Sequence, residues 1–365
     1  MINPIFRISK WMSKVYLVLL LLTSCEHAEQ DTKEKQNDSA KNYSIISRAK
    51  YHDQLYGFWL GECIANWTGL VTEMDKIGNI GDIQTGDFYT REDWGKPEKP
   101  NIWGENRTNL SSTINFVFKD TNAIWGADDD TDIEYIYQHL MYTQQTSILS
   151  GEQIREGWLK HIMLEEENFL WVSNQEAYNL MQKGLIPPET SNPKNNKHYS
   201  MIDAQLTTEI FGLFAPGRPD IALKMAYLPI HTTAQKEAAL IADFYVVMYS
   251  LASIADTSES INNQSKWIAC EAREIFADST YPAKMYDYVK SKYDSGISWE
   301  QARDSIYYRY QVNQKDGYKM TSNHLYCNGC FAAGINFAAS LVSYFYGEGD
   351  IVETIKIGSL MGWDS

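Results

Sequence analysis

The stretch YHDQLYGFWLGECIANWTG (residues 51–69) begins the part of the chain that has helical periodicity. Large apolar residues recur in it at the spacing of one helix face: Leu55, Phe58, Trp59 and Ile64. Small residues recur at every fourth position: Gly57, Gly61 and Ala65. The first pattern predicts an amphipathic helix. The second places a stripe of small side chains on that helix, where another backbone can approach closely.

Helical periodicity continues through most of the remaining chain. Further helices are predicted over 131–144, 151–168, 173–183, 201–214, 219–227, 234–256, 262–276, 281–293, 298–311, 329–346 and in the last segment, 347–365. Gly and Pro residues separate these segments, and the alternating apolar runs typical of strands are scarce. The sequence therefore predicts an all-α fold, a single domain of roughly ten or more helices.

Residues 77–127 interrupt this pattern with a stretch rich in Gly, Pro, Asn and Trp. Loops of this length inside compact domains are usually functional or disordered. The aromatic residues spread along the segment favour an ordered loop. It is either a lid facing a ligand or a surface loop held down by its aromatic side chains.

Five acidic side chains crowd the segment GADDDTDIE (126–134): Asp128, Asp129, Asp130, Asp132 and Glu134. The apolar residues that follow repeat at helical spacing, so a helix begins near Asp130 or Thr131. The N–H groups and dipole of a helix N-terminus stabilise one or two carboxylates. Three consecutive aspartates exceed that need. A divalent cation such as Mg²⁺ or Ca²⁺, which takes hard oxygen ligands, would neutralise them, and a solvated acidic cap is the alternative.

The chain has 365 residues and a formal net charge of -15. A strongly acidic surface excludes most nucleic-acid partners, because binding to phosphates needs Lys and Arg. The composition therefore predicts no nucleic-acid partner and is compatible with cation binding.

The N-terminus has the pattern of an export signal. Basic residues precede the apolar run VYLVLLLL (15–22), which is too short to span a bilayer, since spanning takes about 20 residues. The following LTSC (22–25) resembles a bacterial lipoprotein cleavage site, in which Cys25 becomes the lipidated first residue. A secreted protein with an incidental cysteine is the alternative.

The segment after Cys25 is polar and lacks large apolar residues, which predicts a disordered tether. We therefore expect a signal peptide at 1–24, a tether at 25–45 and the folded domain at 46–365. The expected location is the bacterial cell envelope, at the periplasmic or outer-membrane surface, with the lipid anchor as the sole membrane contact.

The other cysteines are Cys63, Cys270, Cys327 and Cys330. The last two form a lone CxxC, which is weak evidence for zinc, because zinc sites usually need a second pair or added histidines. Buried thiols or a local disulfide are the favoured interpretations, ahead of metal or redox chemistry.

Several motifs, in a fixed order, resemble those of the ADP-ribosylglycohydrolases. GFWLGE (57–62) matches an early helix motif that ends in an acid, and DDDT (128–131) matches a Thr/Ser-Asp-Asp-Thr motif that opens a helix. YGEGDIVETIKIGSLMGWDS (346–365) matches the late motif as far as its first aspartate. Between them, 201–234 resembles the family's central segment, and 327–347 its last Asn-containing helix.

This resemblance implies a multi-helix orthogonal bundle of the ADP-ribosylglycohydrolase type with two Mg²⁺ ions. Its metal ligands would be Asp128, Asp129, Asp130 and Asp364. The ions would orient ribose hydroxyls and position water. Either Glu73 or Glu62 would transfer a proton near the reacting bond. Substrate would be bound by His231 and Asn328, while Asp132 and Glu134 are expected to be bystanders.

The resemblance further implies a Mg²⁺-dependent hydrolase of an N- or O-glycosidic bond to an ADP-ribosyl or related ribosyl or glycosyl group. The partner is then a small-molecule or protein-linked substrate of that kind. The second hypothesis is a cell-surface module that binds a sugar or nucleotide without turnover.

Two departures from the family pattern affect the expected activity. Asp128 stands where the family has Ser or Thr, which adds a charge at the metal site. The sequence ends at Ser365, one residue before the second aspartate of the late motif. We therefore expect a truncated domain that binds metal weakly and has little activity.

Overall fold

The computed structural model describes residues 45–102, 104, 110–123, 129–164, 168–319 and 329–364. By its contacts the chain divides into two units, 1–43 and 44–365, and the description below concerns the second. Four residues singled out in the sequence lie outside the described residues: Cys25, Asp128, Cys327 and Asn328. The predicted signal peptide and nearly all of the predicted tether lie outside them as well.

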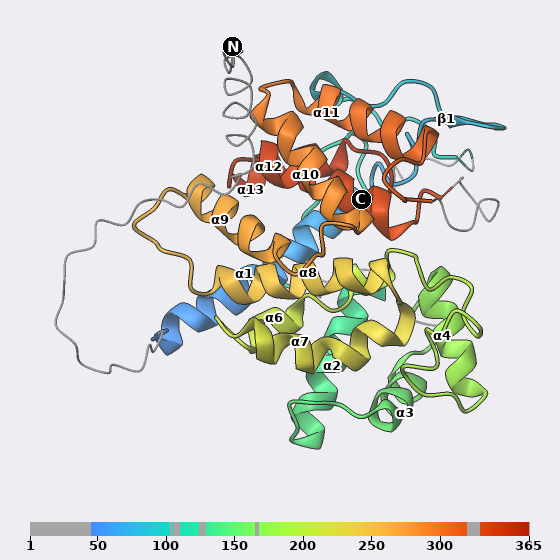
Figure 1. Cartoon of the computed structure of the whole chain (residues 1–365), viewed down its shortest axis with the longest axis vertical. Coiled ribbons are helices and arrows are strands. Elements are labelled where there is room, and N and C mark those ends of the chain that lie inside the picture. The colour runs from blue at the N-terminus through green and yellow to red at the C-terminus, as the bar shows by residue number, and fades with distance from the viewer. Residues whose placement is uncertain are drawn as a thin grey trace, which may run out of the picture. The chain divides into compact units, whose positions relative to one another are not determined.

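The described part of the chain is built from thirteen α-helices and very little sheet, which confirms the predicted all-α fold (Figure 1). The helices are α1 (Arg48–Gly69), α2 (Asp129–Gln144), α3 (Gly151–His161), α4 (Val172–Gln182), α5 (Asp203–Leu206), α6 (Ile210–Phe214), α7 (Pro219–Thr233), α8 (Glu237–Ala252), α9 (Ile261–Arg273), α10 (Tyr281–Asp294), α11 (Trp299–Ile306), α12 (Ala333–Tyr346) and α13 (Ile351–Ser359). A 3₁₀ turn, η1 (Arg91–Asp93), and a π-helical segment, η2 (Tyr307–Val312), complete the helical elements. The strands β1 (Asn79–Ile80) and β2 (Ile83–Gln84) form one antiparallel pair, with Asn79 opposite Gln84 and Ile80 opposite Ile83.

Helix starts agree with local capping chemistry. Ser47 precedes α1 and its side chain accepts a hydrogen bond from the Lys50 amide. Asp350 precedes α13 and accepts from the amides of Val352 and Glu353. These bonds satisfy N–H groups that the first turn of a helix leaves without partners.

The helix predicted over 201–214 is wrong as a single element, since it is divided into α5 and α6. Thr207 Oγ1 donates to the Asp203 carbonyl at 2.9 Å, and Thr208 Oγ1 donates to the Ala204 carbonyl at 2.6 Å. Such side-chain bonds compete with the regular ladder of a helix. The break leaves the segment between the two helices free to approach α2.

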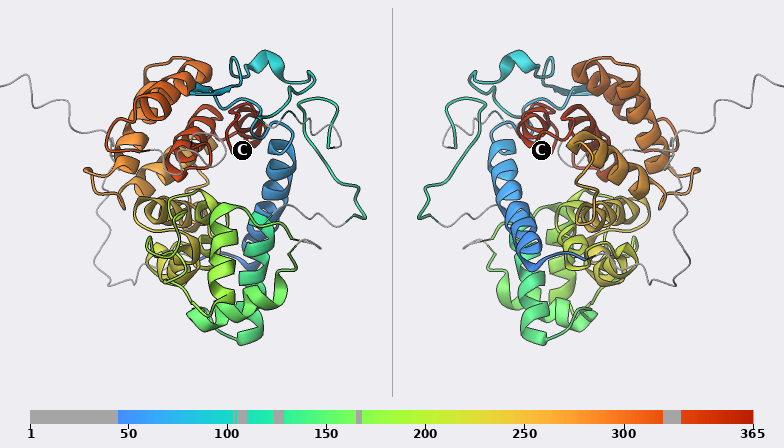
Figure 2. Two further views of the ribbon diagram at one scale, coloured as in Figure 1. Left: turned by 90° about the vertical axis from the view of Figure 1, so that its right-hand side faces the viewer. Right: turned by 90° about the vertical axis from the view of Figure 1, so that its left-hand side faces the viewer.

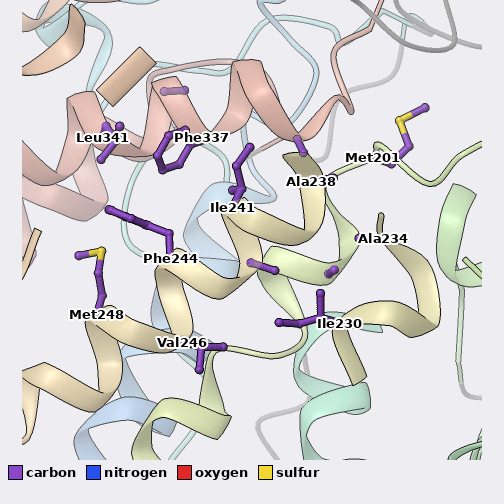
Figure 3. Close-up of a cluster of buried hydrophobic side chains, with 14 of the residues drawn as sticks. Met201, Ile230, Ala234, Ala238, Ile241, Phe244, Val246, Met248, Phe337 and Leu341 are labelled. Atoms are coloured by element: carbon purple, nitrogen blue, oxygen red, sulfur yellow. The ribbon is translucent and has the colours of Figure 1, made fainter. Parts of the chain in front are cut away.

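The core lies around α8, which packs against α5, α6, α7, α9, α10 and α12. Its buried side chains Ile241, Phe244 and Met248 face the neighbouring helices in Figure 3. The Phe244 ring lies 5.2 Å from the Phe337 ring of α12 and 5.4 Å from the Phe276 ring, measured between centroids. Aromatic contacts of this kind dominate the packing energy of a core.

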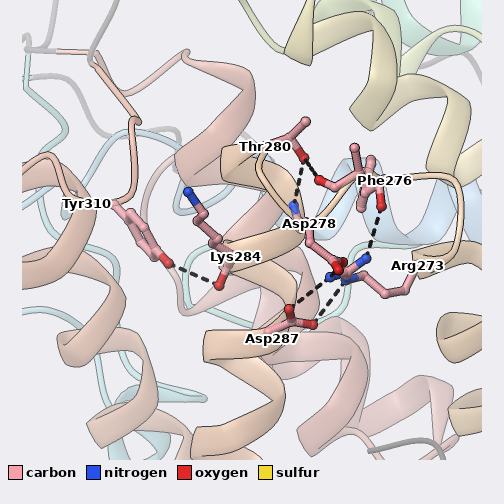
Figure 4. A network of polar contacts seen from close by, with 9 residues as sticks. Arg273, Phe276, Asp278, Thr280, Lys284, Asp287 and Tyr310 are labelled. Carbon is pink, nitrogen blue, oxygen red and sulfur yellow. Dashed lines mark hydrogen bonds and ion pairs between the residues drawn. The ribbon is translucent and has the colours of Figure 1, made fainter. Parts of the chain in front are cut away.

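Polar contacts join α9 to α10 at the edge of this core (Figure 4). The Arg273 guanidinium donates to Asp287 Oδ1 at 3.0 Å and to Asp278 Oδ1 at 2.9 Å. The Arg273 side chain is 12 % exposed, but its partners Asp278 and Asp287 are 93 % and 58 % exposed, so solvent screens these ion pairs.

The small-residue stripe of α1 does not pack against another backbone as predicted. A Cβ atom added at Gly57 would meet no atom within 4 Å, and one at Gly61 would meet only Ile351 Cδ1, at 3.5 Å. Close backbone approach occurs instead at Gly212 of α6, where a Cβ would lie 2.3 Å from the Val246 carbonyl oxygen of α8. The stripe of α1 borders a cavity, while α1 itself runs beside α13 (Figure 2).

The long loop before α2 is held by its aromatic residues. Tyr89 is fully buried, and its hydroxyl donates to Asp75 Oδ2 at 2.7 Å. Arg91 of the same loop pairs with Glu353 of α13 at 2.6 Å. The described residues of 77–127 line neither of the two cavities presented below, which favours the pinned surface loop over the lid.

Within the described residues, no helix combines the length and the apolar character needed to cross a bilayer.

Candidate active site

Two adjoining cavities lie where α1, α2, α5 and the chain end meet. The acidic cavity has a volume of about 290 Å³. Its carboxylate lining comes from distant parts of the chain: Glu73, Asp129, Asp130, Asp132, Asp203 and Asp364. The apolar cavity has a volume of about 520 Å³ and shares Glu73, Asp130 and Asp364 with the first.

The first turn of α2 presents its aspartates to the acidic cavity. Asp129 is 5 % exposed, and its Oδ2 accepts hydrogen bonds from Asn174 Nδ2 at 2.7 Å and from the Trp171 amide at 3.2 Å. Asn174 also donates its backbone N–H to Asp203 Oδ1 at 3.0 Å. Asn174 of α4 therefore fixes two carboxylates on one wall of the cavity.

Glu73 and Asp364 lie together because the loop after α1 is bound to the end of α13. The Thr72 hydroxyl donates to the Ser359 carbonyl, and the Met74 amide donates to the Trp363 carbonyl at 3.2 Å. Met74 is fully buried and has φ of 62°, a conformation that non-glycine residues rarely adopt. Hydrogen bonds on both sides of Glu73 thus place it beside the chain end that carries Asp364.

Gly362 makes this junction possible. Its φ is +89°, and a Cβ atom there would lie 2.3 Å from the Lys76 carbonyl oxygen. A side chain at this position would have to push apart the two segments that hold Glu73 and Asp364. A glycine is required for both the backbone angle and the space.

We expect Gly362→Ala to lower the free energy of unfolding by about 1–3 kcal/mol, because it adds overpacking to backbone strain. Gly358→Ala is the matched control, since a Cβ there would meet Ser343 at an ordinary 3.9 Å. Thermal unfolding of both variants checks this. Equal melting temperatures for the two would contradict the role assigned to Gly362.

Three glutamates from different elements meet beside the apolar cavity and are here called the carboxyl cluster: Glu62 of α1, Glu134 of α2 and Glu209, which precedes α6. Glu134 is fully buried, and its Oε1 accepts from the Ile210 amide at 3.0 Å. Burial, then the charges of Glu209 and Glu62, raise the pKa of Glu134 well above its ordinary value. Burial likewise raises the pKa of Glu209 to about 7. The cluster therefore retains protons at neutral pH.

The raised pKa of Glu209 predicts a pH-dependent stability. Its folded-state pKa of about 7 exceeds the ordinary 4.5, so the folded state binds more protons between these values. The free energy of unfolding should therefore fall as pH rises from about 4.5 to about 7, on the order of 1–3 kcal/mol. Glu209→Gln should flatten this slope, while Glu152→Gln, at an exposed position, should not. Urea unfolding at several pH values measures this slope of the free energy of unfolding against pH. The same slope in Glu209→Gln as in the wild type would refute the assignment to Glu209.

The structure brings most of the sequence-predicted residues to these cavities. Glu73, Asp130 and Asp364 line both, Asp129 lines the acidic cavity, and Glu62 lines the apolar one. His231 lines neither. It lies on α7, where its Nδ1 is 2.8 Å from the Tyr227 carbonyl oxygen and its ring packs on that of Tyr227. Its position gives no support for the predicted role in substrate binding.

Other residues at the cavities were missed or dismissed in the sequence. Asp203 and Glu209 belong to the segment that pointed to His231, but they lie at its start, where it reaches the cavities. Glu134, expected to be a bystander, is buried in the carboxyl cluster. The sequence carried one signal for it: Asp130 and Glu134 are acids four positions apart, which places them on the same face of a helix.

Carboxylates are the oxygen donors that hard divalent cations prefer, so the side chains lining the acidic cavity are of the chemical type that binds such an ion. Among the described residues, however, no group of three or more His, Cys, Asp or Glu is arranged to hold a metal ion.

The cysteines do not contribute to the carboxylate site. Cys270 and Cys330 are each bonded in a disulfide, and Cys63 is a buried cysteine outside any disulfide. Burial is the main cause of the raised pKa of Cys63, which keeps it in the thiol form. Of the two interpretations of the CxxC pair, the buried thiol is therefore wrong for Cys330, while Cys327 lies outside the described residues.

The chain was compared with curated proteins, solved structures and protein-family models. No curated protein and no solved structure matches the chain significantly. The family model described as ADP-ribosylglycohydrolase matches residues 47–365, which include every residue of both cavities. Members of that family are generally metal-dependent hydrolases of glycosidic bonds to ADP-ribosyl-type groups. The chain therefore belongs to the ADP-ribosylglycohydrolase family.

Proposed function

We propose that the chain uses Mg²⁺ to hydrolyse an N- or O-glycosidic bond between an ADP-ribosyl, or related ribosyl or glycosyl, group and its acceptor. The observation that carries the proposal is the convergence of Glu73, Asp130 and Asp364 on one cavity from three distant segments. A purely structural acidic cap would need only the α2 aspartates, without the other two.

Asp129, Asp130 and Asp364 are the described residues that would hold the metal, with Asp128 as a further candidate. When bound, Mg²⁺ would supply positive charge that orients ribose hydroxyls and lowers the pKa of water. The two hydrogen bonds to Asp129 hold one of these carboxylates in place before any ion arrives. Such preorganisation reduces the cost of assembling the site.

Glu73 is our candidate for proton transfer at the reacting bond. It borders both cavities, so it can serve a sugar in one and a leaving group in the other. Glu62 lines only the apolar cavity and lies in the carboxyl cluster, which makes it a positioning residue instead.

An aromatic wall of the acidic cavity suits a planar or sugar ring. The rings of Trp171 and Phe331 stack with centroids 5.9 Å apart and planes at 28°. Stacking surfaces of this kind orient a ligand without charge and complement the acidic opposite wall.

The test of this function is hydrolysis of a substrate panel by the full chain with Mg²⁺. ADP-ribosyl-arginine, ADP-ribosyl-serine and ADP-ribose cover nitrogen-linked, oxygen-linked and free forms. Release of ADP-ribose from a linked substrate supports the hydrolase. Tight binding of the panel without release would favour the alternative, a binding module that does not turn over its ligand.

Location in the cell is a separate proposal. The segment 22–25 supports export and lipidation of Cys25, which would hold the domain at the surface of the cell envelope through a tether. Cys25→Ser should release the protein from the membrane fraction. Retention of this variant on membranes would refute lipid anchoring.

A further inference from the structure

Two histidines lie in contact on α2 and α3, the green helices in the lower part of Figure 1. They are His139 of α2 and His161, the last residue of α3, and are here called the histidine pair. Their ring centroids are 4.9 Å apart and the ring planes stand at 73° to each other. Both residues are partly exposed, so dissolved ions can reach them.

The packing of α3 against α2 brings the histidine pair together. Gly157 of α3 lies against Leu140 of α2, since a Cβ atom at this glycine would be 2.4 Å from Leu140 Cδ1. The missing side chain lets the two helices approach closely. His161 follows Gly157 by four positions, on the same face of α3, and His139 precedes Leu140 in α2. Two packed helices therefore hold the pair.

The ring nitrogens of the pair are available to a ligand. Within the described part of the chain they form no hydrogen bond, unlike His231, whose Nδ1 lies 2.8 Å from the Tyr227 carbonyl oxygen. Burial, then the charges of His139 and Lys160, lower the pKa of His161, which keeps its ring neutral at neutral pH. Neutral imidazole is the form that binds metal ions.

The separation of the rings agrees with two imidazoles bound to one metal ion. An ion about 2.0–2.1 Å from one nitrogen of each ring lies about 3.2 Å from each ring centre, and bond angles of about 90–110° at the ion then put the centres about 4.5–5.2 Å apart. The observed 4.9 Å falls within this interval. Aromatic rings that only pack together span about 4.5–7 Å, so the experiments below must separate an ion site from simple ring packing.

The two nitrogen donors determine which kind of ion fits. Imidazole suits Zn²⁺, Cu²⁺ and Ni²⁺, whereas Mg²⁺ prefers oxygen ligands. Among the described residues no third His, Cys, Asp or Glu joins the pair in a metal-binding group, so water would complete the coordination. A site with open positions of this kind exchanges its ion more readily than a closed structural site with four protein ligands.

We propose that His139 and His161 form a binding site for a divalent transition-metal ion, with Zn²⁺ as the reference ion. The ion joins α2 to α3 through one ring nitrogen of each histidine. Asp129 and Asp130 lie in the first turn of the same α2, so the ion stabilises the helix that presents them to the acidic cavity. Neither histidine lines either cavity, which makes this site independent of the proposed hydrolase function.

Calorimetric titration with Zn²⁺ tests the site in the full chain, without a histidine tag and in excess Mg²⁺. His139→Gln and His161→Gln should each raise the dissociation constant at least about tenfold, because each removes one of the two protein ligands. His52→Gln is the matched control, since His52 of α1 has a side chain that is 79 % exposed and should leave the affinity unchanged. No Zn²⁺ binding by the wild type, or an equal loss in all three variants, would overturn the proposal.

Thermal unfolding tests whether the ion joins the two helices. Zn²⁺ that binds only the folded chain should raise the melting temperature of the wild type by a few degrees at saturating concentration. The same concentration should leave His161→Gln unchanged, and unfolding of this variant without metal checks that it folds. An equal rise in folded His161→Gln would assign the ion to another place and overturn the site.

Asp129→Asn separates the histidine pair from the acidic cavity. Asp129 lines that cavity as a proposed Mg²⁺ ligand, so the variant should lose turnover and keep the wild-type affinity for Zn²⁺. Zn²⁺ binding that depends on the pair, in a wild-type chain without turnover, would support this site and count against the hydrolase. Loss of Zn²⁺ binding in Asp129→Asn would assign the ion to the acidic cavity and overturn the histidine site.

Discussion

Glu73→Gln should lower kcat for a linked ADP-ribosyl substrate by about 10²–10⁴-fold while the protein stays folded. Glu73 borders both cavities, at the place where a bond between a sugar and its leaving group would lie. Gln keeps the size of the side chain and cannot transfer a proton. Steady-state kinetics should therefore show a loss in kcat with little change in KM.

Glu62→Gln is the matched comparison, because Glu62 is the other candidate for proton transfer. Glu62 lies in the carboxyl cluster beside Glu134, and its carboxylate lines only the apolar cavity. We expect a loss well below that of Glu73→Gln, expressed mainly in KM. A larger fall in kcat for Glu62→Gln than for Glu73→Gln would reverse the two assignments.

Asp130→Asn and Asp364→Asn should each lower turnover at least about 100-fold and weaken Mg²⁺ binding. The two aspartates line the same cavities from the first turn of α2 and from the chain end. Each substitution removes a negative charge that a divalent cation needs, while the amide preserves the shape of the side chain. Part of the loss should be recovered at high Mg²⁺, because the defect is one of affinity.

Asp132→Asn is the matched control on the same turn of α2. Asp132 also lines the acidic cavity, but unlike Asp130 and Asp364 it does not line the apolar one, and its Oδ2 accepts from Asn168 Nδ2 at 2.5 Å. We expect turnover within a few-fold of the wild type. Titration calorimetry with Mg²⁺ and kinetics on all three variants measure this, and equal losses in all of them would contradict the distinction.

The helices could be predicted because their apolar spacing is local information. The end of α1 at Gly69 and the start of α10 at Tyr281 agree with the predicted bounds. The division of 201–214 into two helices could not be seen, since it depends on Thr207 and Thr208 bonding back to the chain. The spacing of apolar residues carries no information about side-chain bonds that compete with the backbone hydrogen bonds of a helix.

The acidic cavity was predictable only in part, for a related reason. Three adjacent aspartates signal a site by their density, and family resemblance added Glu73 and Asp364. The carboxyl cluster escaped because Glu134 was interpreted as a bystander of the aspartate run and Glu209 is an isolated acid in the sequence. The two are joined only by the packing of α2 against α5 and the segment before α6. The stripe of small residues on α1 likewise borders a cavity instead of another backbone. Spacing identifies a helix face but not what lies opposite.

The central claim is that the acidic cavity is the site of a Mg²⁺-dependent glycosidic hydrolysis. The most direct measurement is release of ADP-ribose from the linked substrates by the full chain, first with Mg²⁺, then with EDTA, then with Mg²⁺ restored. We predict slow but measurable release with Mg²⁺, its loss with EDTA and its recovery on addition of the metal. Undiminished release in EDTA, or no release from any linked substrate with Mg²⁺ present, would contradict it.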